Sequence, residues 1–166
     1  MDIQNFTPRA YQESILKSCS VKNTLVVLPT GMGKTKIAVL TAIDRIKRYP
    51  NSRVLFLTPT KPLTSQIQKE FQECTDIKNE EILLFTGAIS PKKRSLLEKD
   101  ARIIVSTPQT ISNDIINERI NLENFSLVVF DEAHRATGDY AYTWIAKNYM
   151  QKSQYPRILA LTASPG

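Results

Sequence analysis

Six short apolar segments, separated by longer amphipathic stretches, constrain the fold of this chain more than any other feature. Several are rich in Val, Ile and Leu without alternation, which is typical of strands buried on both faces of a parallel sheet. Strands that alternate with helices form right-handed crossover units, so the order predicts a doubly wound α/β sheet. The expected strands are Thr24–Pro29, Val54–Thr58, Ile82–Phe85, Ile103–Ser106, Leu127–Phe130 and Ile158–Leu161.

Amphipathic segments lie between these strands and fit helices in length and spacing. Thr7 followed by Pro8 is a favourable start for the first helix, because proline suits the first helical turn. No internal repeat or linker interrupts the chain, so its 166 residues predict a single domain. The expected helices are Pro8–Cys19, Lys34–Arg48, Lys61–Cys74, Pro91–Lys99, Gln109–Asn117 and Tyr140–Lys152.

Composition limits the environment and partners of the chain. Hydrophobic residues make up 42% and charged residues 23%, which suits a globular core. Cys19 and Cys74 lack metal-binding or CxxC spacing and are expected to be reduced thiols. Without an apolar signal segment or a run long enough to cross a bilayer, we expect an intracellular protein with no membrane partner. The formal charge of +6 permits a nucleic-acid partner but does not require one.

The residues with the most chemical information follow the ends of the expected strands. In an open parallel sheet, ligands bind beyond the carboxyl ends of the strands. We therefore expect a functional site along this edge. Its segments are Pro29–Thr35, Thr58–Pro62, Thr86-Gly87, Thr107-Pro108, Asp131–His134 and Thr162–Ser164.

The segment Pro29-Thr30-Gly31-Met32-Gly33-Lys34-Thr35 follows a strand and opens a helix, which is the context of a phosphate-binding loop. Glycines let successive backbone N–H groups point inward, and the helix N-terminus adds positive potential. Lys34 can reach the β- and γ-phosphates, and the Thr35 hydroxyl can bind Mg²⁺. The strict pattern GxxxxGK[ST] would place glycine where this chain has Leu28. A glycine turn with an exposed lysine is the alternative.

The sequence Asp131-Glu132-Ala133-His134 follows the apolar run that ends at Phe130. Two adjacent carboxylates at the end of a buried strand are costly unless they bind or react. Asp131 can hold Mg²⁺, through a water, and Glu132 can orient and deprotonate the attacking water. An acidic pair at a helix start is the alternative. His134, the only histidine of the chain, is interpreted as a residue that couples the nucleotide site to a partner.

These motifs, in order and in register, resemble those of superfamily 2 helicases with a DEAH box. The resemblance rests on Arg9-Ala10-Tyr11-Gln12, the phosphate loop, Asp-Glu-Ala-His and Thr162-Ala163-Ser164. The sequence between these motifs is also similar to that of archaeal Hef helicases and Fanconi anaemia group M proteins, over nearly the whole chain. Its segments are Thr58–Leu63, Ser106–Thr110, Asp131–Ala136 and Tyr140–Tyr142. The resemblance implies a RecA-like P-loop NTPase domain that uses ATP and Mg²⁺.

The resemblance also assigns the residues before the first strand to the adenine base. Arg9 would stack on the base, and Gln12 would hydrogen-bond its Watson–Crick and Hoogsteen edges. A side-chain amide is complementary to the N6/N7 pair of adenine, so ATP is expected to bind in preference to GTP. An ordinary amphipathic helix start is the alternative for both residues.

The resemblance places nucleic acid across three loops at the strand ends. Their hydroxyls and backbone N–H groups would grip phosphates without reading sequence. Plain helix capping by the same atoms is the alternative. The expected contact residues are Thr58, Pro59, Thr60, Lys61, Gly87, Thr107 and Pro108, with Gln66 and Arg94 as weaker candidates.

Several other side chains are given expected roles. Thr162 and Ser164 would link ATP hydrolysis to strand movement, as the resemblance implies. Lys92-Lys93-Arg94 is expected to be a solvated helix face. The helical stripe Tyr142, Trp144, Ile145 and Tyr149 is expected to be core and not a stacking platform.

In the family, a second RecA-like domain carries arginine fingers that complete the ATP site, and a helical insertion and, in Hef, a nuclease accompany it. None of these is expected within this chain, so we expect weak nucleotide binding and little ATPase alone. The leading hypothesis is the ATP-binding domain of a DNA helicase or translocase acting on forked or branched DNA in repair. An RNA-directed helicase or sensor is one alternative, and an ATP-gated nucleic-acid clamp is another. A small-molecule P-loop kinase is a third.

Overall fold

The computed structural model describes residues 1–29, 33–133 and 140–163. Within this part of the chain, six parallel strands form one sheet in the order β1-β6-β5-β2-β4-β3. The expected doubly wound parallel sheet is therefore confirmed. The strands are β1 (Thr24–Leu28), β2 (Arg53–Leu57), β3 (Ile82–Phe85), β4 (Ile103–Ser106), β5 (Phe125–Phe130) and β6 (Ile158–Ala163).

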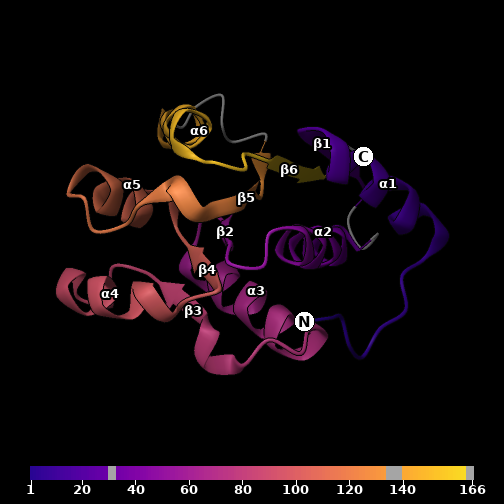
Figure 1. Ribbon diagram of the computed structural model, residues 1–166, viewed down its shortest axis with the longest axis horizontal. Helices are drawn as coiled ribbons and strands as arrows, with labels where there is room; N and C mark the ends of the chain where they lie inside the picture. The colour runs from indigo at the N-terminus through magenta and orange to yellow at the C-terminus, as the bar shows by residue number, and fades with distance from the viewer. Residues whose placement is uncertain (30–32, 134–139, 164–166) are drawn as a thin grey trace.

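In the described part of the chain, helices cover both faces of the sheet (Figure 1). They are α1 (Ala10–Val21), α2 (Lys34–Arg48) and α3 (Lys61–Cys74) on one face, and α4 (Pro91–Leu97), α5 (Pro108–Ile116) and α6 (Tyr140–Lys152) on the other. Short 3-10 turns, Asn79–Glu81, Glu98–Asp100 and Leu122–Asn124, precede β3, β4 and β5. In the described residues, no helix is long and apolar enough to cross a membrane.

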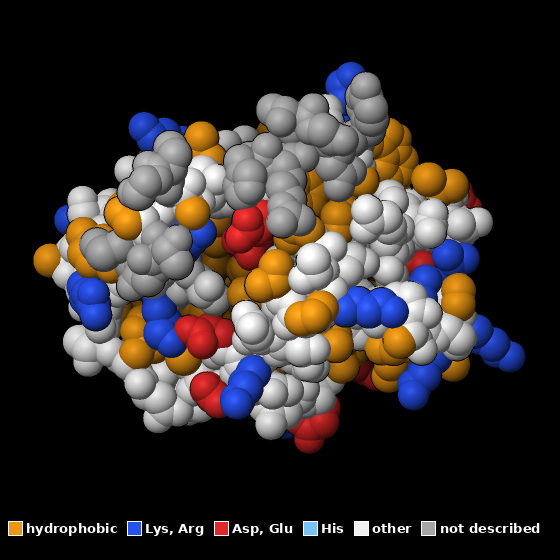
Figure 2. Space-filling model, turned by 180° about the vertical axis from the view of Figure 1, so that it is seen from behind, with side chains coloured by type: hydrophobic (Ala, Val, Ile, Leu, Met, Phe, Trp, Pro, Cys, Tyr) orange, Lys and Arg blue, Asp and Glu red, His pale blue; other side chains and the backbone are white. Residues whose placement is uncertain are grey.

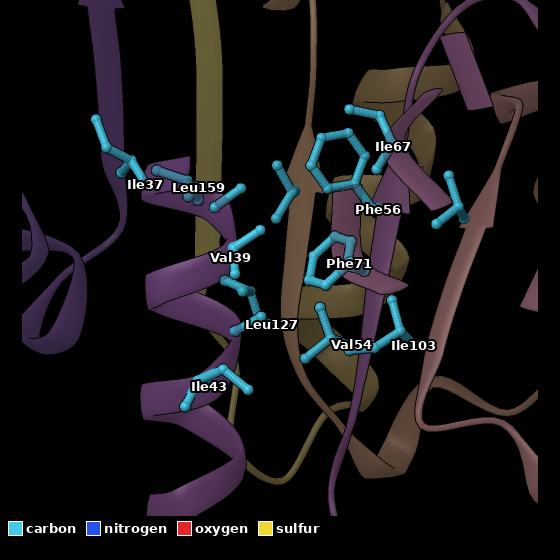
Figure 3. Packing of buried hydrophobic residues seen from close by; sticks show 14 of the residues in the cluster. Ile37, Val39, Ile43, Val54, Phe56, Ile67, Phe71, Ile103, Leu127 and Leu159 are labelled. Atoms are coloured by element: carbon cyan, nitrogen blue, oxygen red, sulfur yellow. The ribbon is translucent and has the colours of Figure 1, made fainter. Parts of the chain in front are cut away.

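The core has two halves, one on each face, because successive side chains of a strand point to opposite faces. On β2, Val54 and Phe56 face the first half, while Leu55 and Leu57 face the second. Figure 3 shows the first half, where Phe56 lies beside Phe71 of α3. The two rings meet edge to face with centroids 6.1 Å apart. This packing fixes the central strands, whose carboxyl ends carry the candidate site.

The structure corrects several expected boundaries. Helix α1 begins at Ala10 and not at Pro8, and α4 ends at Leu97 and not at Lys99. Strand β5 begins at Phe125, two residues earlier than expected. Its polar Ser126 hid this start, but Ser126 is buried and shares a hydroxyl–hydroxyl hydrogen bond of 2.7 Å with Ser52.

The expectation of strands buried on both faces is wrong for β1. Leu25 is 60% exposed and Val27 is 48% exposed. Strand β1 is an edge strand paired only with β6 among the described strands, and its side chains on one face lie outside both core clusters. An apolar run alone does not indicate which strand lies at the edge.

Candidate nucleotide-binding site

The phosphate loop leaves β1 at Leu28 and enters α2 at Lys34. Thr30, Gly31 and Met32 lie outside the described residues, so the structure gives only the strand before them and the helix after them. Gly33 has φ of 73°, in the left-handed region that glycine adopts without strain. A Cβ on Gly33 would also lie 2.6 Å from Nε2 of Gln12. The left-handed conformation therefore favours glycine here, and a side chain would also require the Gln12 amide to move.

Gln12 fastens α1 to the end of the phosphate loop. Its side chain is buried, with Oε1 accepting a hydrogen bond from the Arg9 N–H at 2.9 Å and Nε2 donating to the Gly33 carbonyl at 3.4 Å. An amide group has two acceptor lone pairs and two donor hydrogens, so both atoms keep capacity for a second partner. The expected contact of Gln12 with adenine thus stays a prediction.

A pocket of about 240 Å³ lies between the chain before α1 and the start of α2. Arg9 and Gln12, the residues expected to hold adenine, lie on its wall together with Gly33. Phe6 and Tyr11 also line it, and the Lys36 ammonium lies 5.1 Å from the centre of the Phe6 ring. Sequence reasoning missed these two aromatic residues, although both flank Arg9 closely in the sequence.

Asp131 follows β5 directly and is held from three sides. Its carboxylate accepts a hydrogen bond from the Thr58 hydroxyl at 3.1 Å. Its N–H donates to the Leu57 carbonyl at 2.8 Å, and its own carbonyl accepts from the Tyr142 hydroxyl at 2.7 Å. Thr58 is adjacent because β2 and β5 are neighbouring strands paired at Leu57 and Phe130. The carboxylate position is therefore set by β2, β5 and α6 together.

Burial raises the pKa of Asp131, because the charged form loses hydration there. The hydrogen bond from Thr58 and the positive charge of Lys34 act in the opposite direction on this pKa. Lys34 and Asp131 thus lie within electrostatic reach of each other, although Lys34 starts α2 after β1 and Asp131 ends β5. The intervening strand is β6, so the sheet order brings the two together.

Glu132 adopts φ of 56°, a left-handed conformation that is unfavourable for a residue with a side chain. Such a conformation costs on the order of 1 kcal/mol and persists where the surroundings enforce it. Both backbone polar groups of Asp131 are hydrogen-bonded, and the chain leaves the extended conformation of β5 at Asp131 and Glu132.

The loops expected to contact nucleic acid differ in what they expose. Thr58 is buried and bonded to Asp131, and Thr107 is buried with its hydroxyl 3.0 Å from that of Thr110. Both hydroxyls have partners within the protein, so the expected contact of Thr58 and Thr107 with nucleic acid stays a prediction. Lys61 and Gly87 are exposed, and Thr60 caps α3 by accepting from the Leu63 N–H at 3.4 Å.

The remaining expected positions divide in the same way. Pro59 is partly exposed, whereas Pro108 is buried in the first turn of α5. Thr162 is partly buried near the end of β6, while His134 and Ser164 lie outside the described residues. Gln66 is exposed on α3.

The cluster Lys92-Lys93-Arg94 is a solvated face only in part. Lys92 and Lys93 are exposed, but Arg94 is buried and paired with Asp114 of α5. Arg94 therefore cannot be a surface contact. On the face seen in Figure 2, basic side chains are scattered among hydrophobic and acidic ones, so the formal charge of +6 is not gathered there into one stripe.

The helical stripe on α6 is core, as expected. Tyr142, Ile145 and Tyr149 are buried, and Trp144 packs against the same cluster while partly exposed. The Tyr142 ring meets Phe130 edge to face with centroids 5.1 Å apart. The Tyr142 hydroxyl donates a hydrogen bond to the Asp131 carbonyl and so helps to position Asp131. The helical periodicity predicts that the Tyr142 ring is buried, but it does not predict the partner of the hydroxyl.

Here a helix starts with Lys34 after a strand and a loop, and Asp131 follows a buried strand on the far side of one intervening strand. This arrangement occurs in RecA-like P-loop domains. Fold and site together assign the chain to this class. The model of one protein family, described as type III restriction enzyme, res subunit, matches residues 5–166. The chain therefore belongs to this family.

Named relatives are helicases and are much longer than this chain. MJ1505 of Methanocaldococcus jannaschii, which carries the name of an ATP-dependent RNA helicase, is 45% identical over 158 residues, covering 95% of this chain and 20% of that protein. The DEAD-box ATP-dependent DNA helicase Fancm of Drosophila melanogaster is 39% identical over 166 residues, covering 98% of this chain and 11% of that protein.

A solved structure agrees with these relatives. The crystal structure of the Pyrococcus furiosus Hef helicase domain is similar with a TM-score of 0.95 and 47% identity. The similarity covers 100% of this chain and 36% of that one. The expected resemblance to Hef and Fanconi anaemia group M helicases is confirmed, and the RecA-like fold with it.

Proposed function

We propose that this chain binds ATP and forms the first RecA-like domain of an ATP-dependent DNA helicase or translocase. The observation that carries the proposal is that Lys34 and Asp131 share one edge of the sheet, within electrostatic reach. A lysine for the β- and γ-phosphates and a carboxylate for the metal ion are two sides of a nucleotide triphosphate site. The names of MJ1505 and Fancm, both ATP-dependent helicases, support this reading.

The nucleotide would lie along the start of α2, with its base in the pocket near Phe6. Arg9 and Gln12 would contact adenine, and the backbone N–H groups of Thr30, Gly31, Met32 and Gly33 would surround the phosphates together with Lys34. The pocket beside Gly33 supports this placement, because it opens at the end of the loop where the phosphates would begin. Discrimination of ATP from GTP follows from the amide of Gln12.

The side chains of Thr35 and Asp131 fit a magnesium site. A hydroxyl and a carboxylate are the oxygen ligands that Mg²⁺ accepts from proteins that also hold phosphates. A buried carboxylate whose pKa is raised by burial is a group that a cation would stabilise in its charged form. Bound Mg²⁺ would neutralise charge on the β- and γ-phosphates. Glu132 would accept the proton of the attacking water.

Nucleic acid would bind beside this site, at the carboxyl ends of β2, β3 and β4. Thr60, Lys61 and Gly87 offer exposed groups there, while Thr58, Pro59, Thr107 and Pro108 would contribute through the shape and backbone of their loops. Phosphate contacts of this kind carry no sequence information. DNA, in forked or branched form, is favoured by the similarity to Fancm and to Hef. RNA is the second candidate, because MJ1505 carries an RNA helicase name.

A second RecA-like domain would complete the ATP site in the longer protein. The chain spans 36% of the Hef helicase domain and 11% to 20% of the two named relatives, so further domains are expected. An arginine finger from that domain would accelerate phosphoryl transfer by about 10³-fold or more. His134, Thr162 and Ser164 would couple the two domains to nucleic acid.

Glu132→Gln separates a hydrolase from an ATP-gated clamp. In the full-length protein, we expect the variant to bind a fluorescent ATP analogue like the wild type and to lose about 10²-fold or more in ATP turnover. Equal turnover of wild type and variant, measured as phosphate release with DNA present, would instead support a clamp.

Competition distinguishes DNA from RNA as the substrate. A labelled forked DNA bound to the full-length protein is titrated with unlabelled forked DNA or with duplex RNA of the same length. Displacement by the fork at lower concentration is expected. More effective displacement by duplex RNA would reject the DNA assignment while leaving the ATP site intact.

A further inference from the structure

The ion pair between Arg94 of α4 and Asp114 of α5 lies outside the ATP site. Nε of Arg94 donates to one carboxylate oxygen and Nη2 to the other, each at 2.8 Å. The two residues are 5% and 1% exposed. Arg119 also donates from Nε to Asp114 at 2.8 Å. Because desolvation offsets much of the attraction within a buried pair, its geometry calls for an explanation beyond stability.

The same guanidinium holds the turn that carries Gly87. Nη1 of Arg94 donates to the carbonyl of Ile89 and, at 3.4 Å, to the carbonyl of Thr86. The turn is closed by the Ile89 N–H on the Thr86 carbonyl at 3.1 Å. In a trans peptide the carbonyl and the next N–H point in opposite directions, so Arg94 directs the Gly87 N–H away from itself. Gly87 is exposed, and no atom lies within 4 Å of the position of a Cβ.

Through Asp114, this turn is tied to the helix that begins at Pro108. Strands β3 and β4 are paired from Ile82 and Ile103 to Phe85 and Ser106, so the loops after them leave the sheet side by side. Asp114 lies in α5, and its carbonyl accepts the Arg119 N–H at 2.8 Å just beyond the helix. One carboxylate thus ties the Gly87 turn to α5, the helix that follows another of the three loops that the proposed function places against nucleic acid.

We propose that Arg94 and Asp114 are positioning residues for nucleic-acid binding, holding the Gly87 turn and the start of α5 in one geometry for a phosphate. Neither side chain touches the nucleic acid. The proposal rests on the proposed function, because the phosphate belongs to the strand bound there. Two guanidinium groups against one carboxylate also leave one positive charge beneath the turn, which favours an anion above it.

A matched ion pair at the opposite end of the sheet provides the control. Arg53 at the start of β2 pairs with Glu98, and its Nη1 donates to the Glu98 carbonyl at 2.6 Å. Their side chains are 14% and 12% exposed. This pair is also largely buried and holds the segment after α4, but it lies at the amino end of β2, away from the proposed nucleic-acid face.

The experiment compares Arg94→Lys, Asp114→Asn and Arg53→Lys in this chain. Binding of a labelled single-stranded DNA is measured by fluorescence anisotropy, binding of a fluorescent ATP analogue by titration, and melting by circular dichroism. Arg94→Lys and Asp114→Asn are expected to weaken DNA binding at least fivefold while ATP binding changes less than twofold. Arg53→Lys is expected to lower the melting temperature similarly and to leave DNA binding within twofold.

DNA binding of Arg94→Lys equal to the wild type would overturn the proposal, and so would an equal loss in Arg53→Lys. Lys61→Glu tests the proposed function separately. If Lys61→Glu weakens DNA binding and Arg94→Lys does not, only the positioning role fails. If the wild-type chain does not bind DNA, the variants are compared in the full-length protein, and failure of that protein to bind DNA refutes the proposed function.

Hydrogen exchange on the wild-type chain tests the same idea without a substitution. Added DNA is expected to slow amide exchange in the Gly87 turn and in the first turn of α5 together. Slowing in only one of the two would show that they are not one unit and would overturn the proposal.

Discussion

Gly33 is the residue at which the phosphate loop depends most directly on the absence of a side chain. Its φ of 73° and the 2.6 Å approach of Gln12 Nε2 to a Cβ position act together. We predict that Gly33→Ala lowers the free energy of unfolding by about 1–2 kcal/mol, because both strain and a steric clash are introduced. It should also weaken ATP binding. Urea denaturation and a fluorescent ATP titration measure the two effects.

Gly87→Ala is the matched control for stability. Nothing lies within 4 Å of its Cβ position, and Gly33 is the glycine with a positive φ in the described chain. Its change in the free energy of unfolding should stay below about 0.5 kcal/mol. Equal destabilisation by the two substitutions would contradict the role given to Gly33.

We expect the charge of Asp131 to lower the stability of the free domain and to strengthen binding of Mg²⁺ with ATP. Its folded pKa is raised above the unfolded value of 3.8 by burial, so the unfolded state loses its proton first as pH rises. The contribution of Asp131 to stability therefore declines from about pH 4 up to the folded pKa and stays low above it. We predict that Asp131→Asn is more stable than the wild type at pH 7 and that the difference shrinks near pH 4.

The same substitution should weaken binding of Mg²⁺ with ATP at least tenfold, because a metal ligand is lost. Thermal unfolding at the two pH values and calorimetric titration measure the two sides. A variant that melts below the wild type at pH 7 would show that the Asp131 charge is stabilising in the free domain.

At the residue scale, the sequence revealed residue types better than partners. The pattern predicted that Lys34 and Asp131 follow strands of one sheet, and the structure places both at the same edge. The sequence pattern did not reveal that the hydroxyls of Thr58 and Tyr142 donate hydrogen bonds to Asp131. Hydrogen bonds between segments that are distant in the sequence leave no periodic signal. Phe6 was missed for the same reason, as its neighbour Lys36 is contributed by another element.

At the scale of elements, Arg45 ties the end of α2 to the amino end of the sheet. It is 2% exposed, with Nε donating to the Ser126 carbonyl at 2.8 Å and Nη2 to the Tyr155 carbonyl at 2.9 Å. Its guanidinium also lies 4.8 Å from the centre of the Tyr49 ring. We predict that Arg45→Ala lowers the free energy of unfolding by about 3 kcal/mol, because a cavity and unpaired buried carbonyls remain.

Arg48→Ala serves as the comparison, since Arg48 is exposed and pairs with Asp44 only at 4.0 Å. An exposed pair of this kind contributes less than about 0.5 kcal/mol. Urea denaturation of both variants tests the contrast. Similar midpoints for the two would mean that the Arg45 contacts do not hold α2.

The elements themselves were largely predictable because buried parallel strands leave continuous apolar runs. The predictions that were wrong concern the solvent exposure and the contacts of individual side chains. Leu25 and Val27 were predicted to be buried, but they are exposed because β1 lies at an edge of the sheet. Arg94 read as solvated because it follows two exposed lysines, yet it points to Asp114 in a helix twenty residues further along the chain. The local periodicity of the sequence does not predict that Arg94 pairs with Asp114.

At the scale of the whole molecule, the carboxyl edge of the sheet divides into two halves. Strands β1 and β5 lead to residues proposed for ATP, and β6 between them carries Thr162, which is proposed for coupling. Strands β2, β4 and β3 lead to the residues proposed for nucleic acid. The hydrogen bond from Thr58 to Asp131 crosses the boundary between β2 and β5. We therefore expect this hydrogen bond to couple the proposed nucleotide and nucleic-acid sites.

We predict that Thr58→Val weakens the coupling between the two ligands. In the full-length protein, the factor by which a non-hydrolysable ATP analogue changes DNA affinity should fall severalfold, because the shared contact is lost. Anisotropy titrations with and without the analogue measure it. An unchanged factor in a folded variant would exclude the Thr58–Asp131 contact as a coupling route.

In the proposed function, the start of α2 and the end of β5 form one wall of an ATP site. Isothermal titration of the 166-residue chain with ATP and Mg²⁺, repeated with GTP and with Lys34→Ala, tests it most directly. We predict weak, one-to-one ATP binding that is stronger than GTP binding and is lost in Lys34→Ala. Undiminished ATP binding by a folded Lys34→Ala variant would contradict it.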